Sequence, residues 1–239
     1  MQRIGPEDSL AQRTQQRYAR LAGFVYLWLI VTDMAGFLTI PRIIGSGTFA
    51  EAVARVVASE RLYRTALCSE LIESLSTVLL AFALYVTLKP VSKLLAQIAM
   101  YWRLGESFIG GVTLIFSFML LRLYLAPHTN SGLGVGELQG LVALTGDAIF
   151  VAFNISAIFF SISSTLFFYL FFKSRYIPRV LSAFGVFASI LVMIACFATL
   201  IFPGHAGRLQ YGWAPLFLAE VVTGFWLMLF AVKTQADCE

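Results

Sequence analysis

The chain has 239 residues, of which 59% are hydrophobic and only 13% are charged. Soluble domains carry about 25% charged residues, so long membrane-spanning segments account for this composition better than one buried core does. The net charge of +4 does not indicate nucleic-acid binding, because the basic residues lie in short connections between apolar segments, where membrane topology explains them. The three cysteines are scattered and have neither a disulfide framework nor metal-ligand spacing.

Six apolar segments are long enough to cross a bilayer as helices. In chain order they are Ala19–Ile40, Leu62–Leu88, Leu94–Leu125, Leu138–Phe172, Arg179–Phe202 and Trp213–Val232. Pro41 follows the first segment, Pro127 closes the third, and Pro178 is placed to start the fifth. The sequence therefore predicts an all-α fold, a polytopic transmembrane helix bundle that forms a single domain over residues 1–239.

The connection after the first segment contains a short amphipathic helix. Thr48 and Glu51 have the spacing of a capping box, in which each side chain binds a free backbone N–H of the other residue. One face of the helix that follows is apolar, and its residues are Phe49, Val53, Val56 and Val57. Such a helix either lies on the outer leaflet of the membrane or covers a pocket between the spanning helices.

The basic residues predict the orientation of the bundle. Ten of them, including all four lysines, lie on the side of the two termini, and six arginines lie on the other side. The positive-inside rule then makes the N-terminal segment 1–18 and the tail 233–239 cytoplasmic. We expect a multi-pass protein of the cytoplasmic (inner) membrane, with the lipid bilayer as its first partner.

Six acidic residues fall inside the apolar helices or at their outer ends, and Arg103 is the one basic residue at membrane depth. The acids are Asp33, Glu70, Glu73, Glu106, Asp147 and Glu220. A rise of about 1.5 Å per residue places them in the outer half of the bilayer. Glu70 and Glu73 share a helix face with Thr77, and Arg103 and Glu106 are close enough on one helix to pair. We predict that these side chains line an outward-facing pocket, with Asp33 and Asp147 at its rim.

One arginine cannot balance six ionised acids in a medium of low dielectric constant. Some of the acids must be protonated, hydrated, or neutralised by a bound cation. The alternative without a ligand is an interhelical polar network that only fixes the packing of the bundle.

The sequence contains no catalytic or cofactor-binding motif, so it assigns no catalytic residue and no cofactor. His128 and His205 are the two histidines, and they fall in outer loops without ligand spacing, which predicts no metal site. Serines neighbour the acids, but no histidine is placed to act as their base.

Several short motifs resemble a bacterial integral membrane family catalogued as domain of unknown function 4386. They are Arg-Leu-Ala-Gly-Phe-Val-Tyr-Leu at 20–27, Leu-Lys-Pro-Val at 88–91, Arg-Leu-Gly-Glu at 103–106, Ser-Arg-Tyr-Ile-Pro-Arg-Val-Leu at 174–181, and Glu220 with Gly224, Trp226 and Leu227. The resemblance spans most of the chain. It implies a multi-helix membrane protein and carries no established activity.

Three functions are compatible with the acidic layer. A binding or sensing protein would hold a cation or a small polar ligand there, and this is the interpretation we favour. An ion- or proton-coupled transporter would use the acids as a relay, although the inner halves of the helices offer only hydroxyls such as Thr87 and Ser164. A membrane-embedded enzyme would pair two carboxylates as acid and base.

Overall fold

The computed structural model describes residues 6–128 and 132–232, and within these ranges every regular element is a helix. The long ones are α1 (Pro6–Ile44), α3 (Glu60–Leu88), α4 (Lys93–Leu125), α5 (Val135–Ser174), α6 (Arg179–Ile201) and α8 (Trp213–Phe230), and two short ones are α2 (Phe49–Ala58) and α7 (Ala206–Leu209). In the described part of the chain, six helices are long and apolar enough to cross a membrane. The all-α, multi-pass prediction is confirmed, and the tail 233–239 lies outside the described residues.

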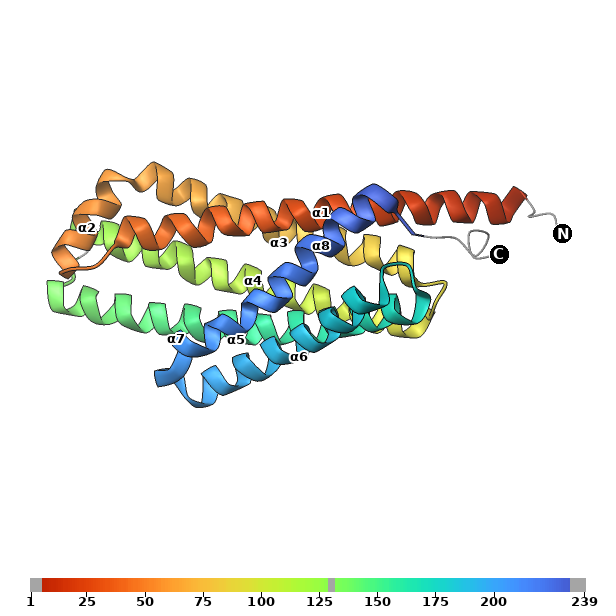
Figure 1. Ribbon diagram of the computed structural model, residues 1–239. Helices are drawn as coiled ribbons and strands as arrows, with labels where there is room; N and C mark the ends of the chain where they lie inside the picture. Colours follow the sequence, from red (N-terminus) through yellow and green to blue (C-terminus); the bar gives the residue numbers. More distant parts are fainter. Residues whose placement is uncertain (1–5, 129–131, 233–239) are drawn as a thin grey trace.

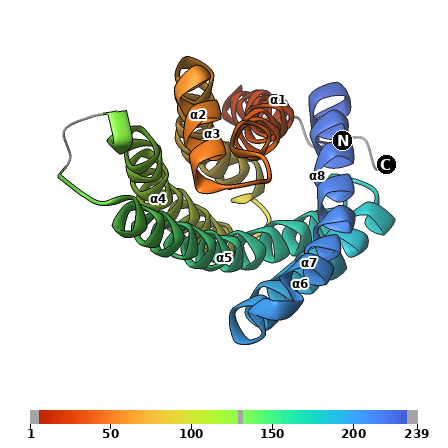
Figure 2. The ribbon, with the colours of Figure 1, turned by 90° about the vertical axis from the view of Figure 1, so that its left-hand side faces the viewer.

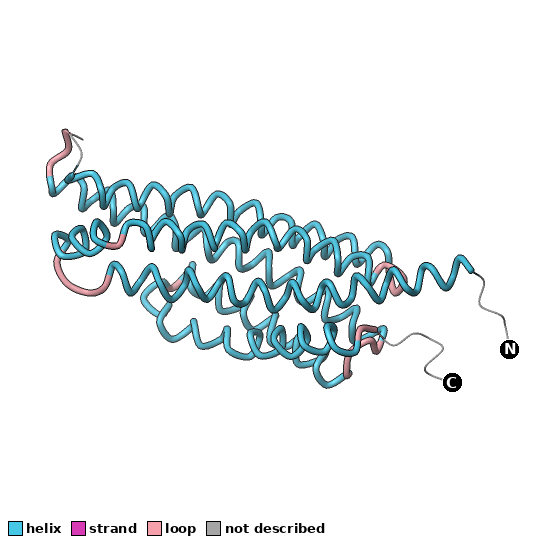
Figure 3. Tube along the Cα trace, turned by 90° about the horizontal axis from the view of Figure 1, so that it is seen from above, coloured by secondary structure: helices cyan, strands magenta, loops and turns pink. Residues whose placement is uncertain are grey.

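The spanning helices form one elongated bundle (Figure 1). Neighbours in the chain pack against each other from α3 to α6, and α8 closes the arrangement by packing against both α1 and α6. Seen from one end, α4 and α5 lie side by side, with α1 and α3 on one face of them and α6 and α8 beyond (Figure 2). The bundle is drawn from above in Figure 3, where α1 extends past the other helices. The start of α1 and the end of α8 lie at the same end of the molecule, called the termini end below; the opposite end is the α2 end.

The first helix is longer at both ends than the sequence predicts. It begins at Pro6 rather than Ala19, and it continues through Pro41 to Ile44. Pro41 removes one backbone hydrogen bond but does not end the helix. Arg55 of α2 caps the helix end, since its guanidinium donates to the carbonyl oxygen of Ile44 at 2.6 and 3.0 Å.

The short helix α2 confirms the predicted capping box. The backbone N–H of Glu51 donates to the Thr48 hydroxyl at 3.3 Å, and the N–H of Thr48 donates to the Glu51 carboxylate at 3.0 Å. Val53 and Val56 are buried, and the Phe49 ring stacks on Tyr124 of α4 at 6.0 Å between centroids. The apolar face of α2 therefore packs on the bundle rather than on lipid.

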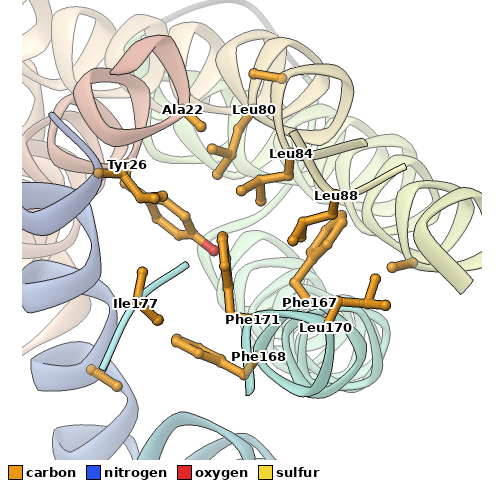
Figure 4. Packing of buried hydrophobic residues seen from close by; sticks show 14 of the residues in the cluster. Ala22, Tyr26, Leu80, Leu84, Leu88, Phe167, Phe168, Leu170, Phe171 and Ile177 are labelled. Atoms are coloured by element: carbon orange, nitrogen blue, oxygen red, sulfur yellow. The ribbon is translucent and has the colours of Figure 1, made fainter. Parts of the chain in front are cut away.

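Two apolar clusters fill the bundle. The larger lies toward the termini end and includes Tyr26 of α1, Leu84 of α3 and Phe168 and Phe171 of α5 (Figure 4). The smaller lies toward the α2 end and includes Ile43, Val56, Leu67, Leu114 and Leu121. On α1, α3 and α4, a stretch of residues that belongs to neither cluster separates the two.

Candidate functional site

Arg103 is the centre of a polar network that joins three helices. Its side chain is buried, with 2% of the residue exposed. Nη1 lies 3.2 Å from the Glu106 carboxylate on the same helix, and Nη2 lies 3.7 Å from the Glu220 carboxylate on α8. Ser164 of α5 lies 3.4 Å from Nη1 and donates its hydroxyl to Glu220 at 3.3 Å. A single guanidinium thus ties α4, α5 and α8 together.

An aromatic stack supports the same guanidinium from one side. The Arg103 Cζ atom lies 4.6 Å from the centroid of the Phe160 ring, which is the distance of a cation–π contact. Phe160 stacks on Trp213 at 5.9 Å, and Trp213 stacks on Phe153 at 5.7 Å. This stack fixes the position of the arginine against α5 and the start of α8.

A second group of acids faces this network from α1 and α3. Asp33, Glu70 and Glu73 are close enough to interact electrostatically, and Glu73 interacts in the same way with Arg103 and Glu106. The Thr77 hydroxyl donates to Glu73 at 3.0 Å, as their shared helix face predicts. Glu70 lies directly against Gly36 of α1, where an added Cβ would stand 2.5 Å from its Oε1. Within the described residues no hydrogen bond or ion pair joins Asp33 or Glu70 to another side chain.

The two groups together form a polar layer between the apolar clusters. On α1, Asp33 lies between Leu29 of the larger cluster and Ile43 of the smaller one. On α3, Glu70 and Glu73 lie between Leu67 and Leu80, and on α4 the arginine and its partner lie between Ala99 and Leu114. The layer is not fully enclosed, because Asp33 is exposed and Glu70, Glu73 and Glu106 are half-buried.

One acid stands apart from this layer. Asp147 is exposed on α5, and no hydrogen bond or ion pair joins it to another residue that the structure describes. The other five acids and Arg103 are connected through the contacts given above. The structure therefore brings together six of the seven residues singled out from the sequence.

Three contributors to the network were not recognised from the sequence. Ser164 was counted among the hydroxyls of the inner half, yet it bridges Arg103 and Glu220. Phe160 carries the cation–π contact. Tyr26, almost fully buried on α1, lies near Glu220, Arg103 and Glu106. Phe160 and Ser164 are four residues apart and so share one helix face, and this spacing is the sequence signal that indicates a common site for the two.

Two buried polar atoms in this part of the bundle have no hydrogen-bond partner among the described residues. They are Nε of Arg103 and the hydroxyl of Thr223, which follows Glu220 by three residues on the same helix face. Buried polar atoms are almost always paired, so these two donors are available to an oxygen that does not belong to the described chain.

Two hollows lie nearer the α2 end. One has a volume of about 400 Å³ between α1, α2 and the start of α3, and the other, about 190 Å³, lies between α5, α6 and α7. Neither is lined by an acid of the polar layer. Among the residues that the structure describes, no group of three or more His, Cys, Asp or Glu side chains is arranged to hold a metal ion.

The fold and the composition define the class of protein: it is a multi-pass helical integral membrane protein. The chain belongs to the family described as Domain of unknown function (DUF4386), whose model matches residues 21–231. The match includes every residue of the polar layer, and it confirms the resemblance noted from the short motifs. No curated protein and no solved structure is detectably similar to the chain.

Proposed function

We propose that this membrane protein binds a small cation or a small cationic polar molecule in its polar layer, and that its role is to bind or sense that ligand. The observation that carries the proposal is the unbalanced charge. Arg103 is occupied by Glu106 and Glu220, while Asp33, Glu70 and Glu73 lie together with no basic side chain bound to them in the described residues. Ionised carboxylates at membrane depth are stable only when they are paired, and a cation would pair with these three acids where no basic side chain does.

The apolar clusters favour binding over passage through the membrane. The larger cluster fills the bundle between the polar layer and the termini end, with Leu84, Phe168 and Phe171 almost fully buried (Figure 4). It offers a migrating ion few polar groups.

The proposal includes the orientation expected from the basic residues. With both termini in the cytoplasm, the polar layer lies in the outer half of the inner membrane and the ligand arrives from outside the cell. The bilayer is then the surrounding medium and the ligand is the specific partner.

A binding measurement on the purified full-length protein tests this function. The thermal unfolding temperature is measured in detergent with sodium, potassium, calcium, putrescine or choline chloride at constant ionic strength. A bound ligand stabilises the folded state in proportion to the logarithm of its concentration. We expect at least one cation to raise the unfolding temperature of the wild type and to lose this effect in Glu73→Gln.

Asp147→Asn is the matched control, because it removes a carboxylate of a spanning helix outside the polar layer. It should respond to the cation as the wild type does. If no cation stabilises the wild type, or if Glu73→Gln responds like Asp147→Asn, the binding proposal fails. Cation flux into proteoliposomes that disappears in Glu106→Gln would instead identify a transporter.

A further inference from the structure

The larger hollow, about 400 Å³ at the α2 end, has a lining unlike that of the polar layer. Arg42 and Thr39 contribute from α1, Arg55 from α2, and Ser59 from the junction of α2 and α3. Ile43 and Leu62 supply an apolar side. The hollow therefore combines two positive charges and two hydroxyls with a hydrophobic wall.

Arg55 is held rigidly at the edge of this hollow. Its Nε and Nη2 donate to the backbone carbonyls of Ile44 and Ser46 at 2.6 to 3.0 Å. Gly45, with a φ of +63°, lies against the guanidinium, since a Cβ there would stand 3.2 Å from Nε. These contacts leave the two N–H groups of Nη1 free, because an arginine has five donors.

The other polar groups of the hollow are also unused by the described chain. Arg42 is exposed and makes no hydrogen bond or ion pair with another described residue, and the same holds for the hydroxyls of Thr39 and Ser59. Two guanidiniums and two hydroxyls around one space are donors suited to a group with several anionic oxygens. No carboxylate lines the hollow to compete for them.

The position of the hollow indicates the source of that group. It lies where α1 ends and α3 begins, and both helices are long and apolar enough to cross a membrane. The ends of such helices are expected at the depth at which the headgroups of one leaflet meet water. Arginines at this depth attract anionic lipids. The positive-inside rule predicts few basic residues at the α2 end, and binding of an anionic group in the hollow explains why arginines are present there.

We propose that this hollow binds a phosphate group, supplied by a phospholipid of the leaflet at the α2 end. Arg42, the Nη1 atom of Arg55, Thr39 and Ser59 contact the phosphate oxygens, and Ile43 and Leu62 contact the glycerol and the first carbons of the acyl chains. The site is separate from the polar layer and does not depend on the function proposed for it.

Native mass spectrometry of the full-length protein in detergent tests this site. Phosphatidylglycerol is titrated in one arm, and monogalactosyl diacylglycerol, which has no phosphate, is titrated in a second. In a third arm, inorganic phosphate is added and the unfolding temperature is measured. Arg42→Gln is the test variant, because Arg42 is exposed and the fold does not depend on it. Arg61→Gln removes the same charge from an exposed position of α3 outside the hollow and is the control.

We expect the wild type to retain phosphatidylglycerol in preference to the galactolipid. Arg42→Gln should bind phosphatidylglycerol about fivefold more weakly, and Arg61→Gln should bind it as the wild type does. Stabilisation by inorganic phosphate that depends on Arg42, without a preference for phosphatidylglycerol, would support the phosphate site and make free phosphate its source. Equal losses in the two variants, or no loss in Arg42→Gln in either arm, would overturn the proposal.

Discussion

Arg103 stabilises the bundle by pairing with carboxylates at two other positions of the chain. Its guanidinium is buried and contacts Glu106, Glu220 and the ring of Phe160. Taking a guanidinium out of water costs several kcal/mol, and the gain from two carboxylates and an aromatic face offsets that cost. Removing the arginine leaves two carboxylates without their shared partner, which is more costly than removing one of the acids.

Replacement of Arg103 by Gln should therefore lower the free energy of unfolding by about 3 to 5 kcal/mol, the range found when one partner of a buried ion pair is removed. Thermal or denaturant unfolding in detergent measures the loss. The control is Arg64→Gln, because Arg64 pairs with Glu60 at 2.7 Å in an exposed position. That pair should contribute no more than about 1 kcal/mol.

The double variant Arg103→Gln with Glu220→Gln extends this test. It removes one of the two stranded acids, so it should be more stable than the sum of the two single losses implies. Strict additivity of the two substitutions would show that the 3.7 Å contact between Arg103 and Glu220 has no energetic weight.

The sequence predicts the contacts within one helix and misses those between helices. The pairs Arg103–Glu106 and Glu73–Thr77 follow from the helical repeat and are present. The distance of Ser164 from the helix end predicts a place in the inner half, whereas its contacts depend on the rotation of α5 against α4 and α8. Counting along the helix predicts Asp147 at the rim of the pocket, but its side chain is exposed and lies apart from the polar layer. The rotation of a helix about its own axis is set by packing against its neighbours, and the spacing of residues within that helix does not predict it.

At the scale of elements, the end of α1 illustrates the same limit. Pro41 correctly signals that the helix is close to its end, because the ring removes one backbone hydrogen bond. The helix nevertheless continues to Ile44, and Arg55 of another element binds the carbonyl oxygen of that residue. A proline rule uses local information only, and the compensating contact comes from a residue of the next helix.

The packing of α1 against α8 depends on two glycines. A Cβ on Gly23 would collide with the backbone nitrogen of Met228 and would stand 2.6 Å from the carbonyl oxygen of Gly224. Small residues allow such close backbone approach between membrane helices. Gly224 lies one turn after Glu220, so this contact also positions the acid that binds Arg103.

Gly23→Ala should lower the free energy of unfolding by about 1 to 3 kcal/mol, because backbone atoms of α8 must move away. Gly111→Ala is the matched control on α4, where no atom lies within 4 Å of the added Cβ. Alanine favours helix, so the control should be neutral or stabilised by up to about 1 kcal/mol. The unfolding temperatures of the two variants are compared in detergent. Similar temperatures would mean that α1 and α8 can move apart without loss of stability.

At the scale of the whole molecule, six spanning helices place both ends of the chain on one side of the membrane. The positive-inside rule predicts that this side is the cytoplasm. Protease sites fused to both termini should therefore resist protease added to spheroplasts and become cleavable after permeabilisation. A site inserted between Gly132 and Leu133, at the opposite end, should be cleaved without permeabilisation. Cleavage of one terminus alone would contradict the number of spans, and cleavage of both would reverse the orientation.

The composition and the apolar segments predicted this architecture well. Long hydrophobic runs must be helices in a bilayer, because no other local structure satisfies every backbone group there. Composition does not predict which of those helices pack against each other, because the lipid tails and the helix side chains are equally apolar. The closing contacts of α8 with α1 and α6 therefore appear only in the structure.

The separation of Glu106 and Glu220 in the chain has a consequence for biosynthesis. When the ribosome has produced α4, the codons for α8 are still untranslated, and at typical rates of synthesis the last helix follows on the order of ten seconds later. During that interval Glu106, one turn along the same helix, is available to pair with Arg103 as the segment leaves the translocon, and Glu220 is not. Glu106 thus neutralises the arginine during insertion, and Glu220 joins the pair only when the chain is complete.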